Sequence, residues 1–310
     1  MTPRTAEGSA SRRPRVGIDL GGTKIAGALV CGSQKLAVRT VPTPVRSDNG
    51  VFLAATVAEV VTHVDPDGQA EAVAIAAAGR VARGGRRVSL SANLGLVDSP
   101  LADWVSEATG RSVVLVNDVQ AALMAEATLG SARGHDDVFM VALGTGVGGA
   151  FMADGRPVRG AFGAAGDLGH TVVERGGRRC GCGGRGCLDM YGSGRALVGF
   201  AREAGVPVER GEEVAELAQQ GDPDALGAFE QVATWVAVGL TNVVVLLDPS
   251  TIVVGGGLAD CGPILMDPLR NALKDELRRR GYGHVPPLLT GSLRSDAPIL
   301  GAAQLALRGE

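Results

Sequence analysis

The stretch Arg15–Cys31 reads RVGIDLGGTKIAGALVC, and it decides the fold. The apolar run Arg15–Leu20 predicts a short strand, the glycines at 21 and 22 predict a turn, and Ile25–Cys31 predicts the strand that returns. The pattern recurs at residues 139–152, FMVALGTGVGGAFM, as an apolar strand, a Gly-Thr-Gly turn and a strand of small residues. Two copies of such a hairpin indicate a duplicated domain whose halves enclose a cleft.

Strands and helices alternate along the rest of the chain, which is typical of an α/β fold. Further strands are expected at residues 36–41, 72–78, 113–116 and 251–254, and helices at 52–64, 119–129, 222–247, 264–280 and 299–307. We predict two lobes, the first formed by residues 15–118 with 291–310 and the second by residues 119–290. Residues 1–14 are expected to be a disordered tail.

Composition excludes several classes of protein. The chain has 310 residues, of which 45% are hydrophobic, and a formal net charge of -3, so it is neither intrinsically disordered nor a general binder of nucleic acid or anionic membrane. Its best candidate for a membrane span, residues 236–247, is interrupted by Gly239, Thr241 and Asn242. The N-terminus lacks the apolar segment of a secretory signal. We therefore expect a cytoplasmic protein.

Three glycine-rich steps at strand ends predict a nucleotide site. Backbone N–H groups in such turns can cradle phosphate, and Asp19 at the end of the first strand can hold Mg²⁺ directly or through water. Each turn taken alone also fits an ordinary tight hairpin, but the three together fit one ATP lying across a cleft. The expected nucleotide-binding residues are Asp19, Gly21, Gly22, Thr23, Lys24, Gly144, Thr145, Gly146, Gly256 and Gly257.

Two polar clusters suggest chemistry. Asn117-Asp118 follows an apolar strand and precedes a helix, so Asp118 is either a helix N-cap or a carboxylate at the ligand-binding edge of the sheet. Three cysteines crowd within eight residues, and a histidine lies ten residues before the first of them. Three thiolates and one imidazole are the ligands of a closed, structural zinc site, so we expect Zn²⁺ at His170, Cys180, Cys182 and Cys187.

Taken in order, the motifs resemble the ROK family of sugar kinases, most closely actinobacterial glucokinases. They are DLGGTK at 19–24, Asn117-Asp118, LGTG at 143–146, GDLGH at 166–170 and CGCGGRGC at 180–187. The resemblance implies an actin-like (ribonuclease H-like) ATPase fold, ATP-dependent phosphorylation of a sugar and a homodimer or homotetramer. About fifteen residues precede Val16, too few for the DNA-binding domain of the family's repressors, so no nucleic-acid partner is expected.

The resemblance also assigns roles. Asp118 corresponds to the general base that takes the proton of the attacking hydroxyl. The implied substrate-binding residues are Asn93, Asn117, Asp118, Asp167, His170 and Asp189. His170 is expected to bind zinc through one ring nitrogen and the sugar through the other.

The sugar side departs from the family at two positions. Asp167 and Asp189 stand where the family usually has Glu, so each carboxylate is one methylene shorter. Either the backbone has adjusted in a hexokinase that converts glucose to glucose 6-phosphate, or the pocket has been reshaped for another substrate, since misplaced buried hydrogen bonds cost about 1–3 kcal/mol each. The alternatives are a C7-cyclitol 7-kinase of the valiolone type, a kinase of an N-acetylhexosamine, or a sugar-binding regulator without catalysis. Polyphosphate as the donor also stays open.

Overall fold

The computed structural model describes residues 13–44 and 48–306, so most of the expected N-terminal tail and the last residue of the expected C-terminal helix lie outside the described residues. The chain forms two compact units, one of residues up to 122 together with those from 298 onward, and one of residues 123–297. The boundaries expected from the sequence lie a few residues earlier. Each unit is described by itself.

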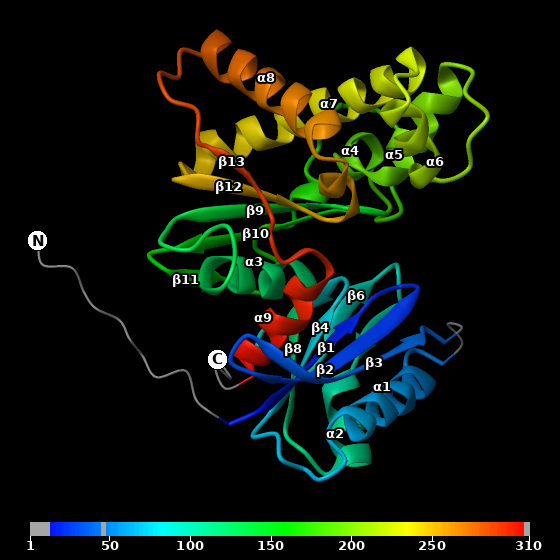
Figure 1. Ribbon diagram of the computed structural model, residues 1–310, viewed down its shortest axis with the longest axis vertical. Helices are drawn as coiled ribbons and strands as arrows, with labels where there is room; N and C mark the ends of the chain where they lie inside the picture. Colours follow the sequence, from blue (N-terminus) through cyan, green and yellow to red (C-terminus); the bar gives the residue numbers. More distant parts are fainter. Residues whose placement is uncertain (1–12, 45–47, 307–310) are drawn as a thin grey trace, which may run out of the picture. The chain divides into compact units, whose positions relative to one another are not determined.

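Unit 1 is built on a five-stranded sheet in the order β3-β2-β1-β4-β8 (Figure 1). The predicted hairpin is confirmed, because β1 and β2 pair antiparallel from Arg15↔Val30 to Leu20↔Ile25. Strands β4 and β8 continue the sheet parallel to β1. The strands are β1 (Arg15–Leu20), β2 (Lys24–Cys31), β3 (Gln34–Pro42), β4 (Val73–Ala77) and β8 (Val113–Asn117).

Helices cover both faces of this sheet, which explains why β4 is a continuous apolar run. Gly27 lies against Val60 of α1 on one face, whereas Gly17 lies against the backbone of α9 at Ile299 on the other. Both glycines bring a helix closer to the strands than a side chain would allow. The helices of unit 1 are α1 (Val51–Val64), α2 (Leu101–Thr109) and α9 (Ala297–Leu305), and α3 (Asp118–Thr128) begins in this unit.

A second, three-stranded sheet of unit 1 was not anticipated from the sequence. It consists of β5 (Arg80–Val81), β6 (Val88–Ser91) and β7 (Leu96–Ser99), which pair in that order. The turn between β6 and β7 carries Asn93. These strands are too short to give a clear period of two in the sequence.

Unit 2 repeats the main sheet of unit 1. Its order is β11-β10-β9-β12-β13, with an antiparallel β9–β10 hairpin and with β12 and β13 parallel to β9. The duplication predicted from the two hairpins is therefore confirmed at the level of topology. The strands are β9 (Val138–Leu143), β10 (Val147–Ala153), β11 (Arg156–Val158), β12 (Thr251–Gly255) and β13 (Leu288–Thr290).

The core of unit 2 lies where its helices pack on this sheet. Buried aliphatic residues of α7 and α8 pack with Phe139, Val141 and Ile252 of the strands. The helices are α4 (Asp189–Gly192), α5 (Gly194–Glu203), α6 (Gly211–Gln219), α7 (Pro223–Leu247) and α8 (Pro263–Arg279), with short 3₁₀ turns η1 (Leu168–His170), η2 (Gly257–Cys261) and η3 (Arg294–Asp296).

Helix α7 is the one described helix that is long and apolar enough to cross a membrane by length and composition. It starts at Pro223 after the Asp222 side chain caps the N–H groups of residues 224 and 225, and it ends before Asp248. Its residues Phe229, Val232 and Val236 are fully buried in unit 2. Helix α7 therefore serves as the core helix of a folded domain.

Two helical glycines give a matched test of this packing. Gly301 of α9 abuts the backbone of Ala121, whereas Gly199 of α5 has open space where a side chain would start. Gly301→Ala should lower the free energy of unfolding by about 2–4 kcal/mol, because a backbone cannot yield to the added methyl. Gly199→Ala should raise it by about 0.5–1 kcal/mol through helix propensity. Urea unfolding followed by circular dichroism measures both, and equal effects would contradict the described packing of α9.

Candidate functional site

Asp118 lies where β8 ends and α3 begins. Its Oδ1 accepts hydrogen bonds from the backbone N–H of Val119 at 2.9 Å and from the Asn117 amide at 3.0 Å. No hydrogen bond from the residues that the structure describes reaches its Oδ2. One oxygen is thus oriented by the protein, and the other is left to accept a proton.

Asn117 connects Asp118 to the turn that carries Asn93. Its Nδ2 also donates to the Gly79 carbonyl at 2.9 Å, and its Oδ1 accepts the N–H of Gln120 at 3.0 Å. Gly79, with φ 118°, packs against Ser91 at the start of the Asn93 turn. The sequence reasoning missed Gly79, although a glycine directly after the apolar run of β4 was the available signal.

The charge of Asp19 affects the protonation of Asp118 within unit 1. Asp19 ends β1, which pairs with β4, and β4 pairs with β8, so both carboxyl groups lie at the same edge of the sheet. Burial raises the pKa of Asp19 to about 6, against the attraction of Lys24. Burial, with the charge of Asp19, raises the pKa of Asp118 to about 7 despite its hydrogen bonds. A carboxylate with that pKa can exchange a proton near neutral pH.

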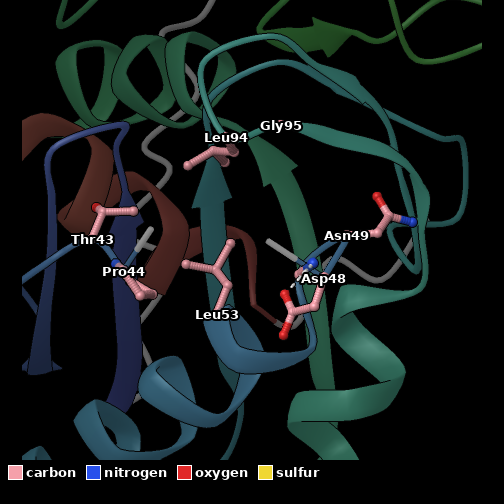
Figure 2. A pocket seen from close by; sticks show the side chains of 8 residues that line it. Thr43, Pro44, Asp48, Asn49, Leu53, Leu94 and Gly95 are labelled. Atoms are coloured by element: carbon pink, nitrogen blue, oxygen red, sulfur yellow. Dashed lines mark hydrogen bonds between the residues drawn. The ribbon is translucent and has the colours of Figure 1, made fainter. Parts of the chain in front are cut away.

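The first glycine turn is fixed by Thr43. The Gly21 N–H donates to the Lys24 carbonyl at 3.1 Å, and the Thr43 hydroxyl donates to the Gly21 carbonyl at 2.7 Å. Thr43 also lines a small surface pocket with Pro44 and with Leu94 of the Asn93 turn (Figure 2). Within unit 1 the structure thus joins Asp118 to Asn117 and Gly79, which packs against Ser91, two residues before the exposed Asn93, while Asp19 and the first turn lie on the same sheet.

The second glycine turn lies in unit 2 between β9 and β10. The Gly144 N–H donates to the Gly146 carbonyl at 2.9 Å. Gly256 packs against the backbone of Leu143, so the glycine step after β12 lies beside the same strand end. This step opens onto the short 3₁₀ turn η2, and α8 follows from Pro263, within one residue of the start expected from the sequence; Gly262, with a φ of 59°, separates the two.

The predicted sugar residues of unit 2 gather at the start of β10. Gly169, between Asp167 and His170, packs against the Val147 backbone. The buried Asp189 accepts the Val147 N–H through Oδ1 at 2.8 Å and pairs with Arg195 through Oδ2 at 2.8 Å. Asp189 thus lies beside the second glycine turn as well as near the His170 segment. No motif in the sequence pointed to Arg195.

The cysteine cluster has the geometry of a metal centre. The ligand atoms of His170, Cys180, Cys182 and Cys187 all lie within 4.8 Å of one another. The Cys182 and Cys187 sulfurs are 3.6 Å apart, and the Cys180 sulfur is 3.7 Å from His170 Nδ1. Four ligands about 2.3 Å from a central zinc would lie about 3.8 Å from each other. The donor set and its spacing therefore fit tetrahedral zinc.

Comparison with known proteins finds similarity over nearly the whole chain. The ROK family profile matches residues 15–309. A glucokinase from Streptomyces coelicolor is 34% identical, covering 94% of this chain and 96% of its own, and an N-acetylmannosamine kinase from Yersinia pseudotuberculosis is 33% identical, covering 92% and 96%. A Streptomyces griseus ROK glucokinase solved with glucose and AMPPNP superposes with a TM-score of 0.88 at 34% identity, covering 95% and 99%. The fold is the actin-like ATPase fold.

The raised pKa of Asp118 predicts a stability effect. Because the folded protein holds this proton more tightly than the unfolded chain, the stabilisation is complete below about pH 4 and is lost as pH rises through about 7. Asp118→Asn cannot ionise, so it should be more stable than wild type at pH 8 by roughly 2 kcal/mol, with the gain vanishing toward pH 4. Chemical unfolding at both pH values measures this. Asp98→Asn, at an exposed carboxylate paired with Arg87, is the control and should show no gain.

Proposed function

The chain belongs to the ROK family, and from this premise we propose that it is an ATP-dependent sugar kinase that phosphorylates the primary hydroxyl of a hexose, with glucose as the first substrate. The observation that carries the proposal is Asp118, with one oxygen oriented by Asn117 and Val119 and the other available as a base. A sugar-binding regulator without catalysis would have no need of such a carboxylate.

The proposed reaction is an in-line transfer. The hydroxyl oxygen attacks the γ-phosphorus, the bond from that phosphorus to the β,γ-bridging oxygen breaks, and ADP leaves. The hydroxyl proton passes to Asp118 Oδ2. Because Asn117 holds the other oxygen, the base approaches the hydroxyl in a fixed orientation.

The donor side is assigned to the glycine turns. In the turn that begins at Gly21, the N–H groups of Gly22 and Thr23 are proposed to bind the phosphates of ATP together with Lys24. The N–H groups of Thr145 and Gly146 are proposed to bind phosphates as well, and Gly256-Gly257 the adenosine. Asp19 is proposed to hold Mg²⁺ directly or through water; this ion would neutralise charge on the phosphates. The expected cytoplasmic location and the homodimer or homotetramer stay predictions.

Asn93, Asn117, Asp167, His170 and Asp189 are proposed to bind the hydroxyls of the sugar. Relatives named for glucose and for N-acetylmannosamine lie at nearly equal identity, so substrate choice needs direct measurement. ADP release should be compared across glucose, N-acetylmannosamine and a valiolone-type cyclitol. Glucose should give the highest kcat/KM. A preference for either of the others would overturn the hexose assignment, and no ADP release with any of them would overturn the kinase.

Zinc is proposed at His170, Cys180, Cys182 and Cys187. Four protein ligands leave no open position, so the ion would be structural and would fix the loop of residues 163–188, which contains Asp167 and directly precedes Asp189. His170 would bind zinc through Nδ1, the nitrogen that faces Cys180, leaving Nε2 for a substrate hydroxyl.

Asp118→Ala should reduce kcat by at least about 10²-fold, the typical contribution of a general base, while the Kd of an ATP analogue measured by calorimetry stays unchanged. In wild type, log kcat/KM should fall with unit slope below pH about 7, because the base must be unprotonated. Unchanged turnover in Asp118→Ala would remove this residue from the mechanism.

Cys182→Ser should abolish the one zinc per chain that elemental analysis is expected to find in wild type. KM for the sugar should rise and the melting temperature should fall, because the loop loses its cross-link. Cys261→Ser, at a cysteine outside the cluster, is the matched control and should keep the metal. Retention of zinc by Cys182→Ser would contradict the four-ligand site.

A further inference from the structure

The second glycine turn is held from one side by the start of helix α5. The Gly194 N–H donates to the Gly144 carbonyl at 2.7 Å. The next residue, Arg195, donates from Nε to the next carbonyl of the turn, that of Thr145, at 3.0 Å. Two successive carbonyls are therefore fixed by two successive residues of α5.

These bonds fix the direction of the turn's amide groups. In a planar trans peptide the C=O and the following N–H point in opposite directions. A Gly144 carbonyl directed to Gly194 therefore turns the Thr145 N–H away from α5, and a Thr145 carbonyl directed to Arg195 does the same for the Gly146 N–H. Thr145 is exposed. The turn thus presents two preset N–H donors on its open side, the arrangement that binds anions.

Arg195 is itself held in place by a buried carboxylate. Its Nη2 pairs with Asp189 Oδ2 at 2.8 Å, and the other Asp189 oxygen accepts the N–H of Val147. The Asp189 side chain is 8% exposed, whereas that of Arg195 is 58% exposed. An exposed arginine paired with an exposed acid would contribute little, but here the acid is shielded from water and cannot turn away.

Gly146 completes the arrangement. A side chain at this position would begin 2.7 Å from Asp189 Oδ1 and 4.0 Å from Arg195 Nη2. The carboxylate therefore sits directly against the backbone of the turn. Each of the four consecutive residues 144–147 contacts Gly194, Arg195 or Asp189.

We propose that Arg195 is a positioning residue for the phosphoryl donor. Held by its ion pair with Asp189, Arg195 orients the Thr145–Gly146 peptide whose N–H binds the donor. The inference rests on the proposed function in that the Gly144–Gly146 turn binds the phosphates. It adds a second task for Asp189, which is proposed above to bind the sugar and whose side chain bonds to Val147 beside the turn and to Arg195. The Arg195–Asp189 pair thus connects the affinity for ATP to a residue that is also proposed to bind the sugar.

Arg195→Gln, Arg195→Lys and Asp189→Asn test the proposal, with Arg202→Gln as the matched control. Arg202 lies on the same helix, is exposed and also donates from Nε to a backbone carbonyl, that of Val208. Each variant is assayed for KM of ATP, KM of glucose and kcat, and AMPPNP binding is measured by calorimetry without sugar.

Arg195→Gln should weaken AMPPNP binding and raise the KM of ATP roughly tenfold, about the contribution of one charge-assisted hydrogen bond, with the KM of glucose unchanged. Arg195→Lys should recover part of the loss because an ammonium can reach one of the two acceptors. In the Arg195→Gln background, Asp189→Asn should add little further loss of AMPPNP affinity.

Three results would overturn the role of Arg195: unchanged AMPPNP affinity in Arg195→Gln, an equal loss in Arg202→Gln, or a lower melting temperature without a change in affinity. A wild-type protein that binds AMPPNP but phosphorylates no sugar would instead overturn the proposed function and leave the affinity test of Arg195 intact.

Discussion

The structure of unit 1 depends on keeping a carboxyl group partly buried at the end of a parallel strand. Asp118 tolerates that position because Val119 and Asn117 donate to one of its oxygens, and Asn117 in turn is held by Gly79 and the N–H of Gln120. The burial that raises the pKa of Asp118 is unfavourable for folding at neutral pH. Stability is thus lost at the residue assigned to catalysis, as is common at functional sites.

Much of the fold was predictable from the sequence because its longest elements have a clear period. The two hairpins, the apolar strand β4 and helix α7 agree with the expected elements within one or two residues, since apolar strand runs, glycine turns and an Asp-Pro helix start are local signals. The sheet β5–β7 was not predictable, because its strands are two to four residues long and are stabilised by pairing with one another rather than by a pattern of their own.

The residues of the candidate site likewise divide into those that the sequence predicts and those that only the structure reveals. Asp19, Asp118 and the glycine turns could be predicted because each lies at or directly after the end of a strand, and the cysteines because metal ligands keep a recognisable spacing. Gly79 and Arg195 could not, since their roles depend on which carbonyls lie opposite them in space. Asp189 illustrates the limit of sequence reasoning. An Asp where the family usually has Glu suggested only a shortened sugar ligand, whereas the structure shows a carboxylate bonded to Val147 and Arg195.

The helix that covers one face of β1 lies far from β1 in the sequence. Gly17 packs against Ile299 of α9, so that face of the first sheet closes only when these two distant segments have come together. Until then, the nascent first unit exposes small apolar residues to other chains. We therefore expect unit 1 to fold later than unit 2, whose residues are contiguous, and to need chaperones that unit 2 does not.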